Sequence, residues 1–173
     1  MTEPEEIVWQ GRFITAKRRG KWEYVSRSRG IRAAVILAIH EESVILVEQF
    51  RVPLGKRCIE LPAGLIGDHD DDGGDTPEKA GARELEEETG FRPTRIEHLG
   101  EFYSSPGMVT ESFHLLRAHD LTRVSDGGGV EGEDITVHIV PLVDLNAFLN
   151  AKRDDGCATD VKLLLLLGGG MLG

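Results

Sequence analysis

The stretch Arg83-Glu84-Leu85-Glu86-Glu87-Glu88-Thr89-Gly90-Phe91 decides how this sequence is interpreted. Glu84 precedes Glu87 by three residues and Glu88 by four, so the three carboxylates share one face if the stretch is helical. Like charges at this spacing repel by about 0.2–0.5 kcal/mol per pair, and no lysine separates them. Two interpretations are open, a solvated acidic face and a site for a cation, and the spacing favours the cation site.

The acidic stretch closes the clearest predicted helix of the chain. Thr76 has the side chain of an N-cap, Pro77 suits the first helical position, and Gly90 supplies the stop signal. Ala82 and Leu85 form a modest apolar stripe that is expected to face the core. We therefore predict a helix between Thr76 and Gly90.

Alternating and β-branched runs on both sides of this helix predict strands. Residues 7–17 and 22–26 flank a basic turn and are expected to pair as an N-terminal hairpin. Further strands are predicted at 33–39, 44–50, 58–61, 95–103, 112–118 and 135–140, and further helices at 142–152 and 158–167. This order of elements predicts an α/β fold in which a mixed β-sheet is sandwiched between helices.

Length and charge exclude several classes of protein. The chain has 173 residues and a formal net charge of −10, which suits one domain and disfavours nonspecific nucleic-acid binding. No apolar run reaches the roughly 18–20 residues of a membrane helix, and the acidic segment Met1–Glu6 does not resemble a secretory signal. Cys58 and Cys157 fit inert reduced thiols. We expect a cytoplasmic protein with neither nucleic acid nor membrane as a partner.

Carboxylate oxygens are the ligands that Mg²⁺, Mn²⁺ and Ca²⁺ prefer, and Mg²⁺ commonly combines one or two carboxylates with substrate phosphates. Calcium buffering is one alternative for the acidic region. The spacing of acids in residues 68–75 does not match an EF-hand loop, however. The pattern favours Mg²⁺, with Mn²⁺ as the alternative.

The stretch from Arg83 to Phe91 resembles the second half of the Nudix box, the signature of the Nudix hydrolases, and fills each of its fixed positions. Glu60-Leu61-Pro62-Ala63-Gly64-Leu65-Ile66 resembles the strand and glycine turn that open the box. The resemblance implies a Nudix-type fold over residues 31–173, with residues 1–30 as an N-terminal β-hairpin extension. The segment from Leu65 to Gly74 is longer than the family spacing, which we interpret as a surface-loop insertion that leaves the role of Asp75 in doubt.

This resemblance implies hydrolysis of a nucleoside diphosphate linked to another group, with the help of a divalent cation. Arg83 is expected to orient a glutamate, and Glu86 to point away from the metal face. The positions that match the metal ligands of the family are Ala63 (through its carbonyl), Glu84, Glu87 and Glu88.

Two further segments resemble the ADP-ribose pyrophosphatase subgroup, namely residues 47–55 and the Pro106-Gly107 turn beyond the box. Trp22 matches an aromatic residue that stacks on the base, although stacking does not name the base. A core tryptophan and a solvent-facing arginine remain the alternatives for Trp22 and Arg51. The substrate-binding residues implied by the resemblance are Trp22, Arg27, Arg51, Pro106 and Gly107.

The subgroup takes its general base from a loop well after the box. Here that loop is Gly127-Gly128-Gly129-Val130-Glu131-Gly132-Glu133-Asp134. Resemblance favours Glu133, with Glu131 second, Glu111 as a third and more structural candidate, and Glu87 assisting. The glycines are expected to let the loop close over substrate.

The resemblance implies hydrolysis of ADP-ribose to AMP and ribose 5-phosphate. GDP-mannose or another nucleoside diphosphate sugar is the alternative substrate, and a nucleotide-sensing module without turnover is the alternative class. A homodimer is also expected, because the N-terminal hairpin carries both tryptophans and a basic patch that could complete the site of a partner. The alternative is a hairpin that caps its own domain.

Overall fold

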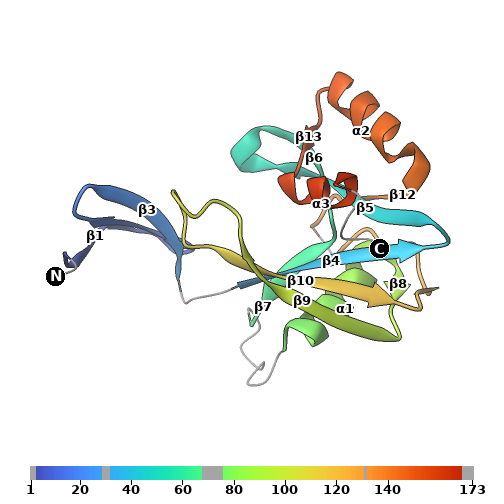
Figure 1. Ribbon diagram of the computed structural model, residues 1–173, viewed down its shortest axis with the longest axis horizontal. Coiled ribbons are helices and arrows are strands. Elements are labelled where there is room, and N and C mark those ends of the chain that lie inside the picture. Colours follow the sequence, from blue (N-terminus) through green and yellow to red (C-terminus); the bar gives the residue numbers. More distant parts are fainter. Residues whose placement is uncertain (1–2, 29–31, 68–75, 131, 169–173) are drawn as a thin grey trace.

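An eight-stranded mixed sheet forms the centre of this computed structural model, which describes residues 3–28, 32–67, 76–130 and 132–168. Figure 1 shows helix α1 on one side of the sheet and helices α2 and α3 on the other. The strands of the sheet are β4 (Arg32–His40), β5 (Ser43–Arg51), β6 (Lys56–Glu60), β7 (Ala63–Ile66), β9 (Arg95–Tyr103), β10 (Ser112–His119), β12 (Thr136–Pro141) and β13 (Ala158–Thr159).

The strand order is β13-β6-β5-β4-β10-β9, with β12 paired to β5 and β7 paired to β4. The β4–β10 and β13–β6 pairs are parallel and the remaining pairs are antiparallel. The short strands β8 (Phe91–Arg92) and β11 (Thr122–Arg123) form a separate pair that the sequence did not predict. The predicted mixed sheet between helices is confirmed.

The two faces of the sheet are buried against different helices, because side chains alternate along a strand. On β4, Ile36 belongs to the apolar cluster that contains Leu85 of α1. Its neighbours Val35 and Leu37 belong to the cluster that contains Leu149 of α2. Both faces are therefore covered, which explains why β4 and β5 are continuous apolar runs.

Helix α1 (Pro77–Thr89) has the boundaries that its capping residues predict. The Thr76 hydroxyl accepts a hydrogen bond from the Lys79 amide at 3.3 Å, and Gly90 adopts a left-handed φ of 76° after the last turn. Leu85 is fully buried as expected, but Ala82 is only half-buried. Gly81 packs closely against the sheet, because a Cβ there would lie 2.3 Å from Leu116 Cδ1.

The N-terminal segment is a three-stranded sheet, not the predicted two-stranded hairpin. Its antiparallel strands are β1 (Glu5–Gln10), β2 (Ile14–Arg19) and β3 (Trp22–Arg27). The predicted strand over residues 7–17 is interrupted because the chain turns at residues 11–13, where the Gly11 amide donates to the Ile14 carbonyl at 2.9 Å. A Cβ at Gly11 would lie 2.3 Å from the Trp9 ring, so glycine permits this turn.

The helix predicted at residues 158–167 is also wrong. Residues Ala158–Thr159 form β13, and the Asp160 carboxylate then accepts from the Lys162 amide at 2.8 Å. This capping contact begins a 3-10 turn (Val161–Leu163), which continues as the short helix α3 (Leu164–Leu167). Helix α2 (Leu145–Asp154) follows a 3-10 turn (Leu142–Asp144), close to its prediction. No helix in the described ranges is long and apolar enough to cross a membrane.

The buried carboxylate of Glu48 links the three strands β5, β6 and β12 with helix α2. Glu48 of β5 accepts hydrogen bonds from Arg57 of β6 at 2.7 Å, His138 of β12 at 2.9 Å and Lys152 of α2 at 2.7 Å. Burial by itself would raise the pKa of Glu48, but the three donors outweigh it and lower the pKa to about 2. No local pattern predicts this cluster, because its members lie up to 104 residues apart in the sequence.

We expect Glu48→Gln to destabilise the protein by about 3 kcal/mol at pH 7, because the buried cations lose their counter-ion. The pKa of Glu48 is lowered on folding, so its stabilising contribution is present above pH 4.5 and is lost as pH falls toward 2. Urea unfolding at pH 7 and pH 3 should show a smaller difference between wild type and variant at pH 3. Glu86→Gln, which breaks an exposed pair with Arg92, is the matched control with a much smaller effect. A difference that is equal at both pH values would contradict the assignment.

Candidate active site

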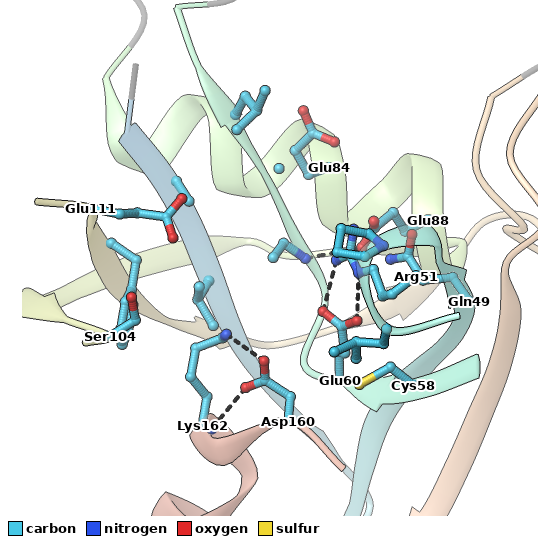
Figure 2. A pocket seen from close by; sticks show the side chains of 18 of the residues that line it. Gln49, Arg51, Cys58, Glu60, Glu84, Glu88, Ser104, Glu111, Asp160 and Lys162 are labelled. Atoms are coloured by element: carbon cyan, nitrogen blue, oxygen red, sulfur yellow. Dashed lines mark hydrogen bonds and ion pairs between the residues drawn. The ribbon is translucent and has the colours of Figure 1, made fainter. Parts of the chain in front are cut away.

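A cavity of about 750 Å³ opens between α1, the ends of β5 and β6, and β7. Figure 2 shows Glu84 and Glu88 projecting from α1 toward this cavity, with Arg51 and Glu60 beside Glu88. Glu133, from the loop before β12, completes this acidic wall. The fold therefore brings together residues from four separate parts of the sequence.

The Glu84 side chain passes over the backbone of a glycine to reach the cavity. A Cβ at Gly64 of β7 would lie 2.0 Å from Glu84 Cδ, so only glycine leaves room for this carboxylate. The Glu84 side chain is 17% exposed, and Arg83 Nη2 lies 3.4 Å from Glu84 Oε1, in the direction expected for an orienting pair. The glycine and the glutamate are thus matched in space.

Glu88 and Glu60 are the two buried acids among the described residues that line the cavity, each 5% exposed. The Oε2 atom of Glu88 accepts a hydrogen bond from the Ala63 amide at 3.0 Å. The pKa of Glu88 is raised to about 8, mainly by burial; the Ala63 amide opposes this rise, and the neighbouring carboxylates of Glu84 and Glu133 contribute to it. A cation beside Glu88 would favour its charged form.

The donor set fits a hard divalent cation. Glu84 and Glu88 lie one helical turn apart and open to the same cavity, and two carboxylates completed by phosphate oxygens suit Mg²⁺. Within the described ranges, no group of three or more His, Cys, Asp or Glu side chains could hold a metal ion by itself. The described residues thus offer two carboxylates from one helix to a cation in the cavity.

Glu87, the third acid predicted to face the metal, lies elsewhere. Its side chain is exposed, and it is not among the described residues that line the cavity. Its backbone carbonyl instead accepts from the Gly129 amide at 3.0 Å. Glu86 faces outward as expected and forms a pair with Arg92 at 2.7 Å.

Each of the three cationic side chains that line the cavity is paired with an acid. Arg51 makes two hydrogen bonds to Glu60, at 2.6 and 2.7 Å, and Arg27 Nε donates to Glu111 at 2.6 Å. The third cation, Lys162, lies 2.8 Å from Asp160. Arg27 and Arg51 were expected here, whereas Glu60, Asp160 and Lys162 were not.

The missed residues gave little signal in the sequence. Glu60 is a buried acid in a strand, 5% exposed, and its position next to Leu61 and Pro62 could have indicated a functional role. Asp160 and Lys162 reach the cavity only because β13 pairs with β6 in parallel.

Trp22, Pro106 and Gly107 meet in a second cavity of about 400 Å³, away from the glutamates. Strand β3 joins the Pro106 loop there, since the Val25 amide donates to the Met108 carbonyl and the Thr110 amide donates to the Val25 carbonyl, both at 2.9 Å. Trp22 is 60% exposed, so the alternative of a core tryptophan is wrong. The predicted substrate-binding residues are thus divided between two cavities.

The loop that carries Glu133 is fixed to α1 by its glycines. The Gly128 amide donates to the Glu88 carbonyl at 2.8 Å, next to the Glu87–Gly129 bond. The expected freedom of these glycines is therefore not what the structure displays, because their backbones satisfy the last carbonyls of the helix. Glu131, Asp75 and the acidic segment 68–75 lie outside the described residues.

Glu88 should make the stability of the cation-free protein fall as pH rises. Its folded pKa of about 8 exceeds the ordinary value of 4.5, so the folded chain binds the extra proton between these values and loses this stabilisation as pH rises through 8. In EDTA, the free energy of unfolding in urea should rise for Glu88→Gln relative to wild type, by at most about 1.4 kcal/mol per pH unit from pH 5 to 8. Glu87→Gln, exposed on the same helix, is the control. Parallel pH profiles for wild type and Glu88→Gln would contradict the buried carboxyl.

Residues 29–160 match the NUDIX domain family. The chain is 40% identical over 159 residues to the GDP-mannose pyrophosphatase of Cronobacter sakazakii, covering 86% of this chain and 76% of that protein. It is 36% identical over 123 residues to the ADP-ribose pyrophosphatase of Bacillus subtilis, covering 70% and 64%. It is also 32% identical to the ADP-sugar pyrophosphatase of Mus musculus, covering 85% and 76%.

A solved structure described as ADP compounds hydrolase superposes with a TM-score of 0.70 over 99% of this chain and 96% of that chain. At 23% sequence identity, this structural likeness shows a shared fold alone. The domain match spans most of the sequence, and Glu84 and Glu88 of the matched helix face the cavity. The chain belongs to the Nudix hydrolase family.

Proposed function

We propose that this protein hydrolyses the diphosphate bond of ADP-ribose, giving AMP and ribose 5-phosphate, with Mg²⁺ as cofactor and Mn²⁺ as its alternative. The observation that carries this proposal is the meeting of Glu84, Glu88 and Glu133 with Arg51 in one cavity. Water is added across the bond, so one phosphate takes the hydroxyl and the other leaves with its bridging oxygen. A nucleotide-sensing module would need no such set of acids.

Glu84 and Glu88 would hold the cation, with the Ala63 carbonyl as a further ligand, whereas Glu87 lies outside the described cavity lining and has no place in this scheme. When bound there, a divalent cation would supply charge neutralisation for the diphosphate and would lower the pKa of a water molecule. Glu133 would take the proton from the attacking water, with Glu131 as the second candidate. Arg51 donates through Nε and Nη2 to the Glu60 carboxylate. This pairing would orient the guanidinium so that its remaining donors reach a phosphate oxygen.

GDP-mannose is the second candidate substrate. The relative with 40% identity carries the name GDP-mannose pyrophosphatase, and the residues around Glu84 and Glu88 contact neither base nor sugar in this scheme. Trp22 would stack on either purine. The choice between the two substrates therefore depends on residues outside the carboxylate cluster.

We also propose a homodimer in which the N-terminal sheet of one chain completes the site of the other. Trp22, Pro106 and Gly107 line a cavity separate from the one with Arg51 and Glu84, so within one chain the proposed base site and phosphate site are apart. The N-terminal sheet also exposes apolar side chains suited to a partner, namely Ile7, Val8, Trp9 and Phe13. Residues 1–30 and 31–173 would then be two functional parts, and the cytoplasmic location stays a prediction.

The activity is tested by assaying ADP-ribose, GDP-mannose and other nucleoside diphosphate sugars with Mg²⁺ and by measuring phosphomonoester products. Glu84→Gln should lower kcat on the order of 10³-fold, because it removes several kcal/mol of transition-state stabilisation. Glu86→Gln on the outer face should retain wild-type turnover. Failure of wild type on the whole panel would exclude the proposed activity, and wild-type turnover in Glu84→Gln would exclude the role of Glu84.

The shared site is tested by mixing Trp22→Ala chains with Glu84→Gln chains, after Trp22→Ala alone has been shown to raise KM. In a shared-site dimer, the wild-type Trp22 of one chain meets the wild-type Glu84 of the other, so the mixture regains one complete site. The mixture should then show wild-type KM at up to half of the wild-type turnover. A monomer by light scattering, or a mixture that shows only the KM of Trp22→Ala, would contradict the dimer.

A further inference from the structure

The loop from Gly127 to Asp134 is held at its first end by helix α1. The Gly128 and Gly129 amides bind the carbonyls of the last turn of the helix, and Gly127 packs so closely that a Cβ would lie 2.4 Å from the Thr89 carbonyl carbon. Gly127 also has a left-handed φ of 68°. A side chain at Gly127 would therefore separate the loop from the helix.

The second end of the loop is held by Arg57, which comes from β6. Its Nη1 donates to Asp134 Oδ2 at 2.7 Å, and its Nη2 lies 3.3 Å from the Asp134 carbonyl oxygen and 3.4 Å from Thr136 Oγ1. The same guanidinium also binds Glu48. Its Nε donates to the Glu48 carboxylate at 2.7 Å, and its Nη2 donates to the Glu48 carbonyl oxygen at 3.0 Å. Arg57 thus joins the loop to the buried carboxylate in β5.

Glu133 lies between these two attachments. Its carboxylate Oε2 accepts from the Val130 amide at 3.0 Å, and its own amide donates to the Val130 carbonyl at 3.0 Å. The Glu133 carboxylate is thus held on the backbone of Val130, and Glu133 directly precedes Asp134 in the sequence. Arg57 is not among the described residues that line the cavity, so its effect on Glu133 would pass through its contact with Asp134.

We propose that Arg57 is a positioning residue, which fixes the Asp134 end of the loop on the buried Glu48 and thereby orients the Glu133 carboxylate in the catalytic cavity. This inference rests on the proposed hydrolytic function. It concerns a residue that neither the Nudix motif nor the cavity lining includes.

The strength of this attachment comes from Glu48. The Asp134 side chain is 83% exposed, and an ion pair between exposed groups adds little stability by itself. Glu48, however, is 7% exposed and accepts from Arg57 through both its carboxylate and its backbone carbonyl, so the plane of the guanidinium is fixed before it meets Asp134. A lysine at position 57 would keep the charge but would lose the fork of donors that serves both carboxylates.

The first test compares Arg57→Lys and Asp134→Ala with wild type in steady-state hydrolysis of the preferred nucleoside diphosphate sugar. Both variants should lower kcat about tenfold or more and leave KM within about twofold, because displacement of a catalytic group by about 1 Å has this order of effect. Asp134→Ala changes an exposed side chain and should fold even if Arg57→Lys does not. Lys152→Met, which removes a different ligand of Glu48, should retain kcat although it loses stability.

The second test asks whether Arg57 acts through Glu133. In a Glu133→Gln background, Arg57→Lys should cause no further loss of kcat, because the group that it positions is already disabled. Multiplicative losses, or an equal loss of kcat in Lys152→Met, would overturn the inference and would assign a purely structural role to Arg57.

Hydrogen exchange separates this inference from the proposed function. The Val130 amide reports the Glu133 carboxylate directly, so its exchange should accelerate at least about tenfold in Asp134→Ala and stay unchanged in Lys152→Met. If the wild type is inactive but the Val130 amide exchanges faster in Asp134→Ala, the proposed reaction is rejected and the attachment is kept. An active wild type with unchanged exchange and unchanged kcat in Asp134→Ala would reject the attachment and keep the reaction.

Discussion

The hydrogen bond between the buried Glu88 carboxylate and the Ala63 amide ties the last turn of α1 to the first residue of β7. One turn earlier, Glu84 occupies the space above Gly64 that any side chain would fill. These two contacts set the height and rotation of the helix over the strand. Because both involve the carboxylates that face the cavity, the fold of this region and its chemistry depend on the same atoms.

The electrostatics of the cavity follow from that packing. Burial, together with the nearby Glu84 and Glu133, raises the pKa of Glu88 to about 8, so the cavity by itself is poorly suited to hold all of its acids in the charged form. Arg51 is held by Glu60 at the same time. A cation and an anionic diphosphate that arrive together would satisfy both halves of the cavity, which is the physical basis of the proposed reaction.

The elements outside the cavity support its geometry from two sides. The glycine backbone at 127–129 closes the carbonyl end of α1, and the cluster around Glu48 joins β5, β6, β12 and α2 below the loop of Glu133. Removing one member of such a cluster strongly destabilises the protein, because the charges of the remaining partners are left without a counter-ion. The same cluster therefore contributes to stability and, through Arg57, to the placement of a catalytic candidate.

Local signals in the sequence were sufficient for some of these features. The caps at Thr76 and Gly90 fixed the limits of α1, the glutamate spacing placed Glu84 and Glu88 on one face, and β-branched runs located the central strands. They failed at Gly11, where one residue ends a strand, and at Ala158–Thr159, where the chain pairs with β6 instead of forming a helix. Propensity describes neighbours along the chain, and in both places the competing contacts decided the outcome.

The sequence by itself determined the family, the helix that carries Glu84 and Glu88, and the order of the main strands and helices. Each of these is encoded within a short stretch. The tertiary structure alone decided that Glu87 faces away from the cavity, that Glu60 pairs with Arg51, and that Trp22 lies in a different cavity from Glu84. Each of these facts depends on how one element packs against another, either α1 on the sheet or one strand beside its neighbour. Register and packing between such strands are set by the whole sheet, so no local spacing contains them.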